Sequence, residues 1–292
     1  SRPNLREGLM NFSDTLERMI RKFERRAPLD DSDRAALRSL PFTRRTASAR
    51  SYIVREGSSP DVTCLLLSGY TFRQKLTGDG GRQIVSFHLP GDFMDLEGSL
   101  LSCADHNIQA LTRVDYAAVP VRHILDLIDN HPRLARAMWI DTLVDASIYR
   151  EWVLNVGRRN ARERIGHLLC EFALRLDLAG LGTTHGYQCP MNQEQIADCT
   201  GLTPIHVNRT LKAMEAEGLI RRHLRFIEIP DWKHLREASG FDDTYLHLRQ
   251  VGEPVVNHHV SRTRGSQTGA NNNSVSAQTS ASARSGERPG PA

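Results

Sequence analysis

Hydrophobic and polar positions change their spacing several times along this chain of 292 residues. In NFSDTLERMIRKFERRAPL the apolar side chains recur at helical spacing and share one side: Phe12, Leu16, Met19, Ile20 and Phe23. Asp30 and Asp31 then precede a second short helical pattern, DSDRAALRSL, which ends at Pro41. Residues 1–41 are therefore expected to form N-terminal helices that pack on the surface of a larger domain.

The pattern between residues 42 and 125 is different. Short apolar segments such as TCLLLSGY, RQIVSFHLPGDF and VDYAAVP are separated by Gly, Pro, Asp and Ser. A spacing of roughly ten residues between such segments is typical of many short antiparallel strands. We expect a jelly roll, or double-stranded β-helix, over residues 42–125.

Helical spacing returns at residues 122–131 and continues from Pro132, a residue suited to the first turn of a helix. The helix predicted over residues 132–159 has two apolar rows, Leu134–Met138 and Ile140–Val144–Ile148–Trp152–Val156. That is more apolar surface than a single solvated helix carries. Part is expected to lie on the roll and part on a second copy of the chain, with an ordinary core helix as the alternative.

Two acidic residues on this helix, Asp141 and Asp145, have two interpretations. If they face a dimer axis, the paired carboxylates oppose association and make it conditional. Surface exposure is the simpler interpretation.

Residues 160–240 predict a helix-turn-helix domain. After the amphipathic NARERIGHLLCEFALRLDL and a loop at 179–190, a short helix at 192–199 is joined through Gly201 to a second helix at 203–217. Thr203 as N-cap and Pro204 at the first helical position mark the start of the second helix. Two strand-like segments, 218–221 and 225–229, resemble a wing, and a helix is expected after Asp231.

The second helix has two unlike faces. Val207, Leu211 and Met214 fall on one side and should pack inward, whereas Arg209 and Lys212 fall on the other. This outer face suits a DNA major groove: arginine pairs with guanine, isoleucine contacts a thymine methyl, and lysine meets a phosphate. Asn192 and Gln193 begin the first helix, where free N–H groups attract phosphate. The candidate DNA-binding residues are Asn192, Gln193, Thr203, Ile205, His206, Asn208, Arg209 and Lys212.

Composition narrows the class of protein. A formal charge of +4 and a pI near 8.9 are compatible with a polyanionic partner but do not identify one. The five cysteines lack the close spacing of a zinc, redox or iron–sulfur motif, and their odd number predicts reduced thiols in the cytoplasm. No apolar run approaches ~20 residues, so no membrane span is expected. Residues 251–292, rich in Ser, Gly, Asn and Ala, are predicted to be a disordered tail.

The order of these parts resembles the Crp/Fnr family of bacterial transcription regulators over roughly residues 42–240. The most specific stretch is QEQIADCTGLTPIHVNRTLKAMEAEGLI, supported by RRNARERIGHLL, SGYTFR and LPGDFMDLEG. The resemblance implies a cyclic-nucleotide-binding-like sensory roll and a homodimer on a pseudo-palindromic operator, with RNA polymerase as a further partner. Arg209 matches the guanine-reading arginine of the family and Lys212 a backbone-contacting lysine. Ile205 replaces a base-reading glutamate, which changes the preferred base pair.

The sensory pocket departs from the resemblance. Members that bind cyclic AMP have a Gly-Glu pair followed by Arg-Ser, whereas this chain has GDFMDLEG and SCADHNIQAL, without arginine. The corresponding pocket residues are Gly91, Asp92, Asp105 and His106. A phosphodiester beside Asp105 would be poorly neutralised, so we expect no tight cyclic-nucleotide binding; a cyclic-nucleotide-responsive regulator is the alternative.

No cofactor or metal ligand is expected. The oxygen-sensing branch of the family uses N-terminal cysteines for an iron–sulfur cluster, and here the first is Cys64. His88 and His106 are interpreted as solvated loop residues.

Two other classes of protein compete with a DNA-binding regulator that has an unidentified effector. A cupin-type metal enzyme needs paired histidines, and no HxH occurs in residues 42–121. A phosphate-cradling loop and a nucleophile elbow are also absent from the sequence. An enzyme is therefore not expected. The remaining alternative is a non-enzymatic ligand-binding or scaffold protein whose winged domain binds protein.

Overall fold

The computed structural model describes residues 12–248. Two helices open this part of the chain, α1 (Phe12–Arg26) and α2 (Asp31–Arg38). Helix α1 buries its apolar side, including Met19 and Phe23, against the long helix α4 (Pro132–Arg158). Asp30 and Asp33 cap α2 reciprocally, which satisfies backbone N–H groups that a helix start otherwise leaves unpaired. The predicted packing role of these helices agrees with this arrangement.

Seven strands build the roll. They pair antiparallel in two sheets, with orders β1-β7-β3 and β2-β6-β4-β5. This topology confirms the predicted β-roll. The strands are β1 (Thr43–Ala47), β2 (Tyr52–Val54), β3 (Val62–Ser68), β4 (Thr71–Leu76), β5 (Arg82–His88), β6 (Asn107–Ala110) and β7 (Val114–Pro120).

The segment that follows β5 runs along β3. The backbone N–H of Leu66 donates to the carbonyl of Asp92 (2.9 Å), and the N–H of Met94 donates to the carbonyl of Cys64 (2.8 Å). A short 3-10 turn, η1 (Glu97–Ser99), follows. This pairing brings the acidic stretch after Met94 to the roll, where its side chains meet those of β4 and β6.

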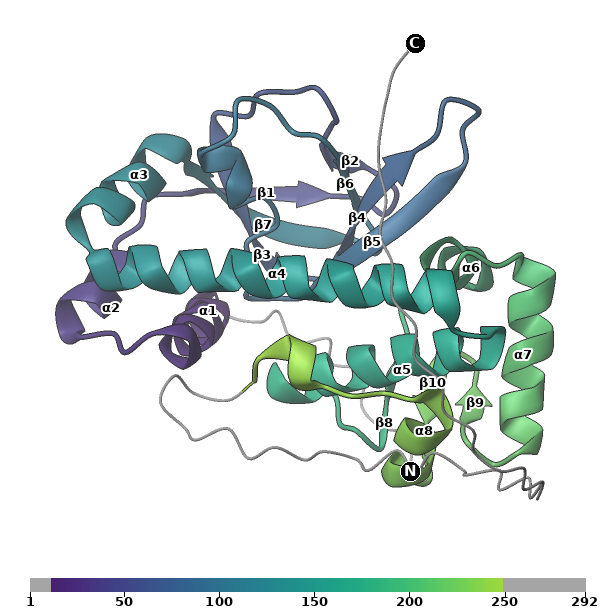
Figure 1. Ribbon diagram of the computed structural model, residues 1–292. Helices are drawn as coiled ribbons and strands as arrows, with labels where there is room; N and C mark the ends of the chain where they lie inside the picture. The colour runs from purple at the N-terminus through teal and green to yellow at the C-terminus, as the bar shows by residue number, and fades with distance from the viewer. Residues whose placement is uncertain (1–11, 249–292) are drawn as a thin grey trace, which may run out of the picture. The chain divides into compact units, whose positions relative to one another are not determined.

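Two helices leave the roll, α3 (Val121–Asn130) and α4, and both match their predicted positions (Figure 1). Both apolar rows singled out on α4 pack mainly within the chain. Leu134 and Met138 join the core under α1, while Val144, Ile148 and Trp152 join the core that the roll shares with the following helices. These five side chains therefore pack within the chain, and the contact of part of α4 with a second copy stays a prediction.

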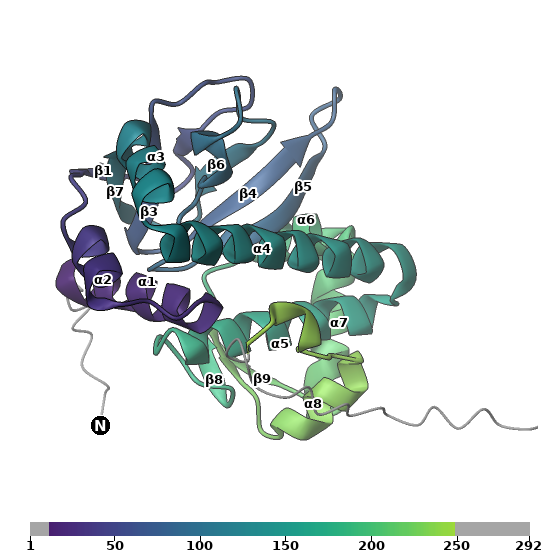
Figure 2. The same cartoon turned by 60° about the vertical axis from the view of Figure 1, so that its left-hand side comes forward.

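The remaining elements form a winged helix-turn-helix, and Figure 2 shows its helices from a second side. A three-stranded sheet, order β8-β10-β9, accompanies the helices. Its strand β8 lies within residues that were predicted to be a loop. A strand of three residues is too short to show a recognisable alternation of apolar and polar positions. The elements are α5 (Ala161–Leu178), β8 (Gly186–Gln188), α6 (Gln193–Thr200), α7 (Pro204–Ala216), β9 (Arg221–His223), β10 (Phe226–Glu228), α8 (Trp232–Ser239) and η2 (Thr244–Leu246).

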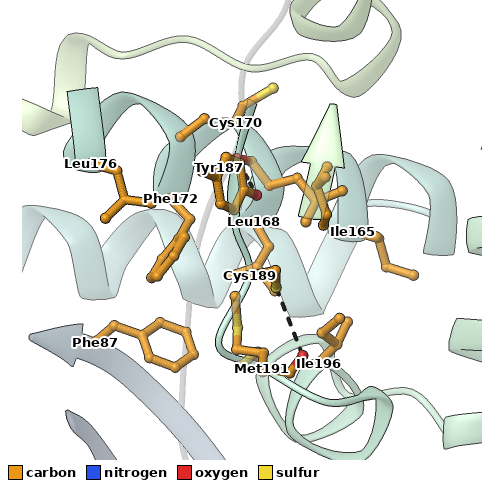
Figure 3. Packing of buried hydrophobic residues seen from close by; sticks show 14 of the residues in the cluster. Phe87, Ile165, Leu168, Cys170, Phe172, Leu176, Tyr187, Cys189, Met191 and Ile196 are labelled. Atoms are coloured by element: carbon orange, nitrogen blue, oxygen red, sulfur yellow. Dashed lines mark hydrogen bonds between the residues drawn. The ribbon is translucent and has the colours of Figure 1, made fainter. Parts of the chain in front are cut away.

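One core runs from the roll through α4 and α5 to the helix-turn-helix. In Figure 3, Phe87 of β5 faces Phe172 of α5, with ring centroids 5.7 Å apart, and Phe172 lies near Tyr187 of β8. Aromatic pairs at such distances contribute about 0.5–1.5 kcal/mol each beyond their buried area. The hydroxyl of Tyr187 donates to the carbonyl of Leu169, so the buried phenol remains satisfied.

All five cysteines are free thiols, and burial raises the pKa of Cys64 and Cys170 to about 12. They therefore serve as small apolar core residues, with the exception of the exposed Cys103. Among residues 12–248, no helix combines the length and apolar character needed to cross a membrane. The tail predicted at 251–292 lies outside the described residues.

Candidate nucleic-acid interface

The first helix of the pair, α6, begins with a capping box. The Asn192 side chain accepts from the N–H of Gln195, whose own side chain accepts from the N–H of Asn192, both at 2.8 Å. Asn192 is thus occupied by its own helix, which limits its predicted phosphate contact to the part of the amide left free, while Gln193 is half-buried beside it. The helix ends at Gly201, whose φ of +63° is a left-handed conformation suited to glycine.

The second helix, α7, starts where predicted. The Thr203 hydroxyl accepts from the N–H of His206 (3.3 Å), and Pro204 follows at the first helical position. Val207, Leu211 and Met214 are buried, as expected from their spacing.

The opposite face of α7 is open to solvent. Ile205 is 84% exposed, and Arg209 and Lys212 are exposed one and two turns further along. Within residues 12–248 neither cation has an ion-pair partner within 4.0 Å. His206 and Asn208 are half-buried on the flanks. The predicted row is therefore brought together on one surface, with two cations free to meet an anion.

The hairpin β9–β10 forms the wing. His223 pairs with Phe226, so Leu224 and Arg225 make the turn, and Leu224 has the left-handed φ of +58° that a non-glycine residue adopts at a cost. Its side chain is fully exposed. Two of the wing arginines have acidic partners: Arg221 pairs with Glu228 (2.8 Å) and Arg222 with Glu215 of α7 (2.6 Å). The basic cluster is thus partly neutralised.

A polar contact ties α6 to the roll. The Arg82 guanidinium of β5 donates from Nε to Asp198 Oδ2 (2.7 Å), and its Nη2 lies 2.5 Å from the same oxygen. Gln83 also donates to the carbonyl of Cys199 (3.3 Å). Any movement of α6 relative to β5 must break these hydrogen bonds. Sequence patterns gave no indication of this contact.

Helix α4 exposes an apolar strip that sequence analysis missed. Trp139 is 68% exposed and Val153 69%, with Leu143 and Leu154 also exposed. At 100° per residue these four positions fall within an arc of roughly 100°, and they span about 22 Å of helix. The spacing of these four residues could have predicted a second apolar face on the helix. The more regular row Ile140–Val144–Ile148–Trp152 on the same helix was assigned instead.

The four residues proposed for an effector pocket are not brought together. Gly91 and Asp92 line a cavity of about 130 Å³ between α1, α4 and α5. There Lys22 lies 2.9 Å from Asp92, and Arg175 lies 3.4 Å from it. Burial alone would raise the pKa of Asp92, but these two cations hold it well below its usual range. Asp105 and His106 do not line this cavity; they lie on the roll beside Asp95.

The same cavity overturns both interpretations of the acidic pair on α4. Asp141 is buried and lies 2.7 Å from Lys22 and 3.3 Å from Arg26, both on α1. Asp145 is half-buried beside it, and burial followed by the charge of Asp141 raises the pKa of Asp145 to about 6. The two carboxylates therefore face α1, because Lys22 and Arg26 of the amphipathic α1 offer the compensating charges that buried acids require.

The expectation that His88 and His106 are solvated is wrong, since both are buried. His88 ends β5 and shares a 3.0 Å hydrogen bond with the Thr71 hydroxyl. Burial, and then the nearby charge of Arg73, lowers its pKa well below the usual value. His106 hydrogen-bonds to Asp105 through Nδ1 at 2.7 Å. Strand pairing removes both imidazoles from water, which single residues in a loop-rich sequence do not reveal.

A buried arginine lies inside the roll. Arg73 of β4 lies 2.5 Å from Glu97 and donates to the carbonyl of Met94 (2.8 Å) and to the hydroxyl of Tyr149 on α4. Burial is the main cause that raises the pKa of Tyr149 to about 12. Sequence analysis missed this cation, because TFRQKL lacks the strict alternation that distinguishes inward from outward positions.

Comparisons with known proteins agree with both halves of this geometry. Residues 163–238 match the family described as the Crp-like helix-turn-helix domain, and residues 44–131 match the cyclic nucleotide-binding domain. The nitrogen fixation regulation protein FixK of Bradyrhizobium diazoefficiens is 36% identical over 168 residues, which cover 56% of this chain and 69% of that protein. The transcriptional activatory protein AadR of Rhodopseudomonas palustris is 31% identical over 188 residues, 64% of this chain and 74% of that protein.

Another relative and a solved structure extend the likeness. The transcriptional activator protein FnrL of Cereibacter sphaeroides is 26% identical over 220 residues, 74% of this chain and 88% of that protein. The structure of FixK2 from Bradyrhizobium japonicum superposes with a TM-score of 0.63 at 25% identity, covering 68% of this chain and 98% of that one. The two family models match the roll and the winged domain.

Proposed function

We propose that this chain, which belongs to the Crp/Fnr family of transcription regulators, reads a pseudo-palindromic DNA operator as a homodimer through α7. Membership makes it a DNA-binding transcription regulator of the Crp/Fnr type. We further propose that the chain forms a symmetric dimer, that residues of α7 read the bases, and that the chain has further partners.

One observation supports the assignment of α7 most strongly. The helix buries Val207 and Leu211 fully while it leaves an isoleucine and two cations exposed on its other face. A helix that only stabilised the domain would gain nothing from exposing Ile205. A DNA groove supplies partners for all three side chains.

Each exposed residue fits a different part of DNA. Arg209 can donate two hydrogen bonds to guanine O6 and N7, which distinguishes base pairs, whereas Lys212 reaches a phosphate as a point charge. Ile205 has no hydrogen-bonding group and suits a thymine methyl. His206 and Asn208 on the flanks can reach base edges or phosphates, and Thr203, Asn192 and Gln193 lie at helix starts where phosphates bind.

The exposed strip on α4 supports a symmetric dimer. Trp139, Leu143, Val153 and Leu154 lie on one helix face, and two copies of such a face bury each other. The proposal therefore moves the dimer seam from the buried row of α4 to this strip. Leu143→Glu should convert the dimer to a monomer in sedimentation equilibrium. Leu76→Glu, at an exposed leucine of the roll, is the matched control and should leave the dimer intact.

The test of DNA reading compares Arg209→Ala with Lys212→Ala by electrophoretic titration on an operator and on shuffled DNA. Arg209→Ala should weaken specific binding by about 1–3 kcal/mol and relax the base preference at one position. Lys212→Ala should weaken both DNAs alike and reduce the salt dependence. Arg122→Ala on α3, an exposed cation far from α7 in sequence, is the control and should change neither. Identical behaviour of the two α7 variants would contradict the proposed division between base and phosphate.

Three further parts of the proposal follow from the relatives and from the roll. Relatives named as transcriptional activators support RNA polymerase as a partner of this chain. Its proposed location is the cytoplasm, where the bacterial chromosome lies. We assign the chain a role in binding and no role in catalysis. Cyclic nucleotides are not proposed as the effector, because the buried carboxylate of Asp95 lies in the roll and the buried cation there, Arg73, is already paired with Glu97.

A further inference from the structure

A cluster of two carboxylates and one imidazole lies in the roll, apart from the DNA-binding face. One ligand atom each from Asp95, Glu97 and His106 falls within 4.8 Å of the other two. Asp95 is 1% exposed and His106 4%. Asp95 and Glu97 belong to the segment that pairs with β3 and the turn after it, and His106 precedes β6, so strand pairing holds the group together.

The buried members of this cluster lack the partners that burial demands. Neither carboxylate oxygen of Asp95, nor Nε2 of His106, has a hydrogen bond within the described part of the chain. Nε2 lies 3.7 Å from Asp95 Oδ1, which is too long for a hydrogen bond. The backbone N–H of Gly98 interacts with the carboxylate outside good hydrogen-bond geometry and offsets only part of the cost of burial. A buried, unpaired acid and a ring nitrogen aimed at it call for a third group between them.

The orientation of His106 matches that of a metal ligand. Its Nδ1 is held by the Asp105 carboxylate at 2.7 Å, and this pairing turns Nε2 inward. A carboxylate behind the imidazole fixes the tautomer and raises the basicity of the ligating nitrogen. Asp105 therefore acts as a positioning residue, since its own side chain is exposed.

We propose that Asp95, Glu97 and His106 bind one divalent transition-metal ion, with water completing its coordination. One imidazole and two carboxylates suit Zn²⁺, Fe²⁺ or Mn²⁺, whereas Mg²⁺ and Ca²⁺ prefer oxygen ligands alone. The Glu97 side chain, 28% exposed, provides the route from solvent. An ion also supplies the positive charge that two carboxylates and only one nearby arginine leave uncompensated.

The site is connected to α4 through one residue. Arg73 pairs with Glu97 on one side and donates to the Tyr149 hydroxyl of α4 on the other. An ion that recruits Glu97 competes with this pair and changes what Arg73 can offer to α4. Ion-dependent DNA affinity is the expected consequence, and it rests on the proposed function, whereas ion binding itself does not.

Titration calorimetry of the chelator-treated chain of 292 residues tests the site with Zn²⁺, Mn²⁺ and, without oxygen, Fe²⁺. The expected result is one ion per chain, a raised thermal unfolding midpoint, and little response to Mg²⁺. Asp95→Asn keeps the shape of the side chain and should weaken binding by at least about 100-fold, while Asp105→Asn should weaken it about 10-fold. His123→Gln, a histidine variant on α3, is the control and should bind as the parent does.

Two outcomes would overturn the proposal. Transition-metal binding that is absent, or equally strong in Asp95→Asn, would show that the cluster holds no ion. If a bound ion left the DNA affinity unchanged, the proposed link between the metal site and α4 would be wrong. A chain that bound the ion but no DNA would instead contradict the proposed function. Because Asn replaces Asp95 without adding volume, loss of folding is not expected to obscure the result.

Discussion

The roll interior and the outer face of α7 both contain polar side-chain atoms without a hydrogen-bond partner within residues 12–248, yet they are built differently. On α7 the cations Arg209 and Lys212 are exposed, and water solvates them until DNA arrives. In the roll, Asp95 and His106 are buried, so water cannot reach them and burial raises the pKa of Asp95. An exposed unpaired charge costs little and suits a large polyanion, whereas a buried one is costly and calls for a small ion.

The largest expected effect separates the two faces of α7 itself. Leu211→Ala removes a buried side chain and should lower the free energy of unfolding by about 2–4 kcal/mol. Ile205→Ala, on the exposed face, should change it by less than about 0.5 kcal/mol while altering the base preference. Urea unfolding of both variants measures the difference, and equal losses of stability would show that Ile205 is packed.

In the roll, substitution of a buried residue is expected to stabilise the protein, whereas Leu211→Ala destabilises it. Asp95→Asn should raise the free energy of unfolding by about 1 kcal/mol in chelator, because it removes a buried, unpaired charge. Glu163→Gln, at a half-buried acid that caps α5, should lower it slightly and serves as the control. A chelator-treated Asp95→Asn protein that is less stable than the parent would show that the carboxylate is satisfied without an ion.

Asp145 extends the comparison to pH. Its pKa is raised from 3.8 to about 6, so the native state binds more protons than the unfolded chain in this interval, and stability falls as the pH rises from about 4 to 7. The charges of Asp141, Lys22, Arg73 and Asp92 act on Asp145, and all of these except Arg73 line the same cavity. Asp145→Asn should flatten this part of the profile and stabilise the protein by about 1 kcal/mol at pH 8, since solvent screens a half-buried group.

Unfolding midpoints measured at several pH values between 4 and 8 check this expectation. Asp177→Asn, at an exposed acid near the end of α5, is a suitable control and should keep the slope of the parent protein. A slope that persists in Asp145→Asn would assign the effect to another group.

The smallest effect concerns the wing. Leu224 has a φ of +58° and a fully exposed side chain, so Leu224→Gly removes backbone strain without losing buried area. The strain of about 1–2 kcal/mol is offset in part by the greater freedom of glycine in the unfolded chain, which leaves a gain of about 0.5 kcal/mol. Thermal unfolding measures it. A loss of stability would mean that Leu224 contributes packing.

Sequence patterns predicted the helix-turn-helix well because its signals are local. Thr203, Pro204 and Gly201 mark boundaries, and the spacing of Val207, Leu211 and Met214 identifies the buried face of α7 without knowledge of any other element. The antiparallel roll also followed from segment length and turn residues. In the roll the strand pairing itself is long-range, as between β2 and β6 or β3 and β7, but the short apolar segments and turn residues that predict the strands are local signals.

The sites that were missed depend on long-range pairing. Arg73 meets Glu97 and Tyr149 only after β4, the segment beside β3 and α4 come together. Lys22 and Asp141 are 119 positions apart, so nothing nearby in sequence indicated their 2.7 Å contact. His88 and His106 were misplaced for the same reason, because burial by sheet pairing leaves no trace in a loop-rich segment.

Selection of bound sequences from a random DNA pool, with the parent protein and with Arg209→Ala, tests the central claim most directly. The pool should be offered with and without a transition-metal ion. We expect the parent to enrich a pseudo-palindrome with half-sites about one helical turn apart, and Arg209→Ala to lose its preference at one symmetric base pair. Enrichment of the same palindrome by both proteins, or of none under either condition, would contradict the reading of DNA by α7.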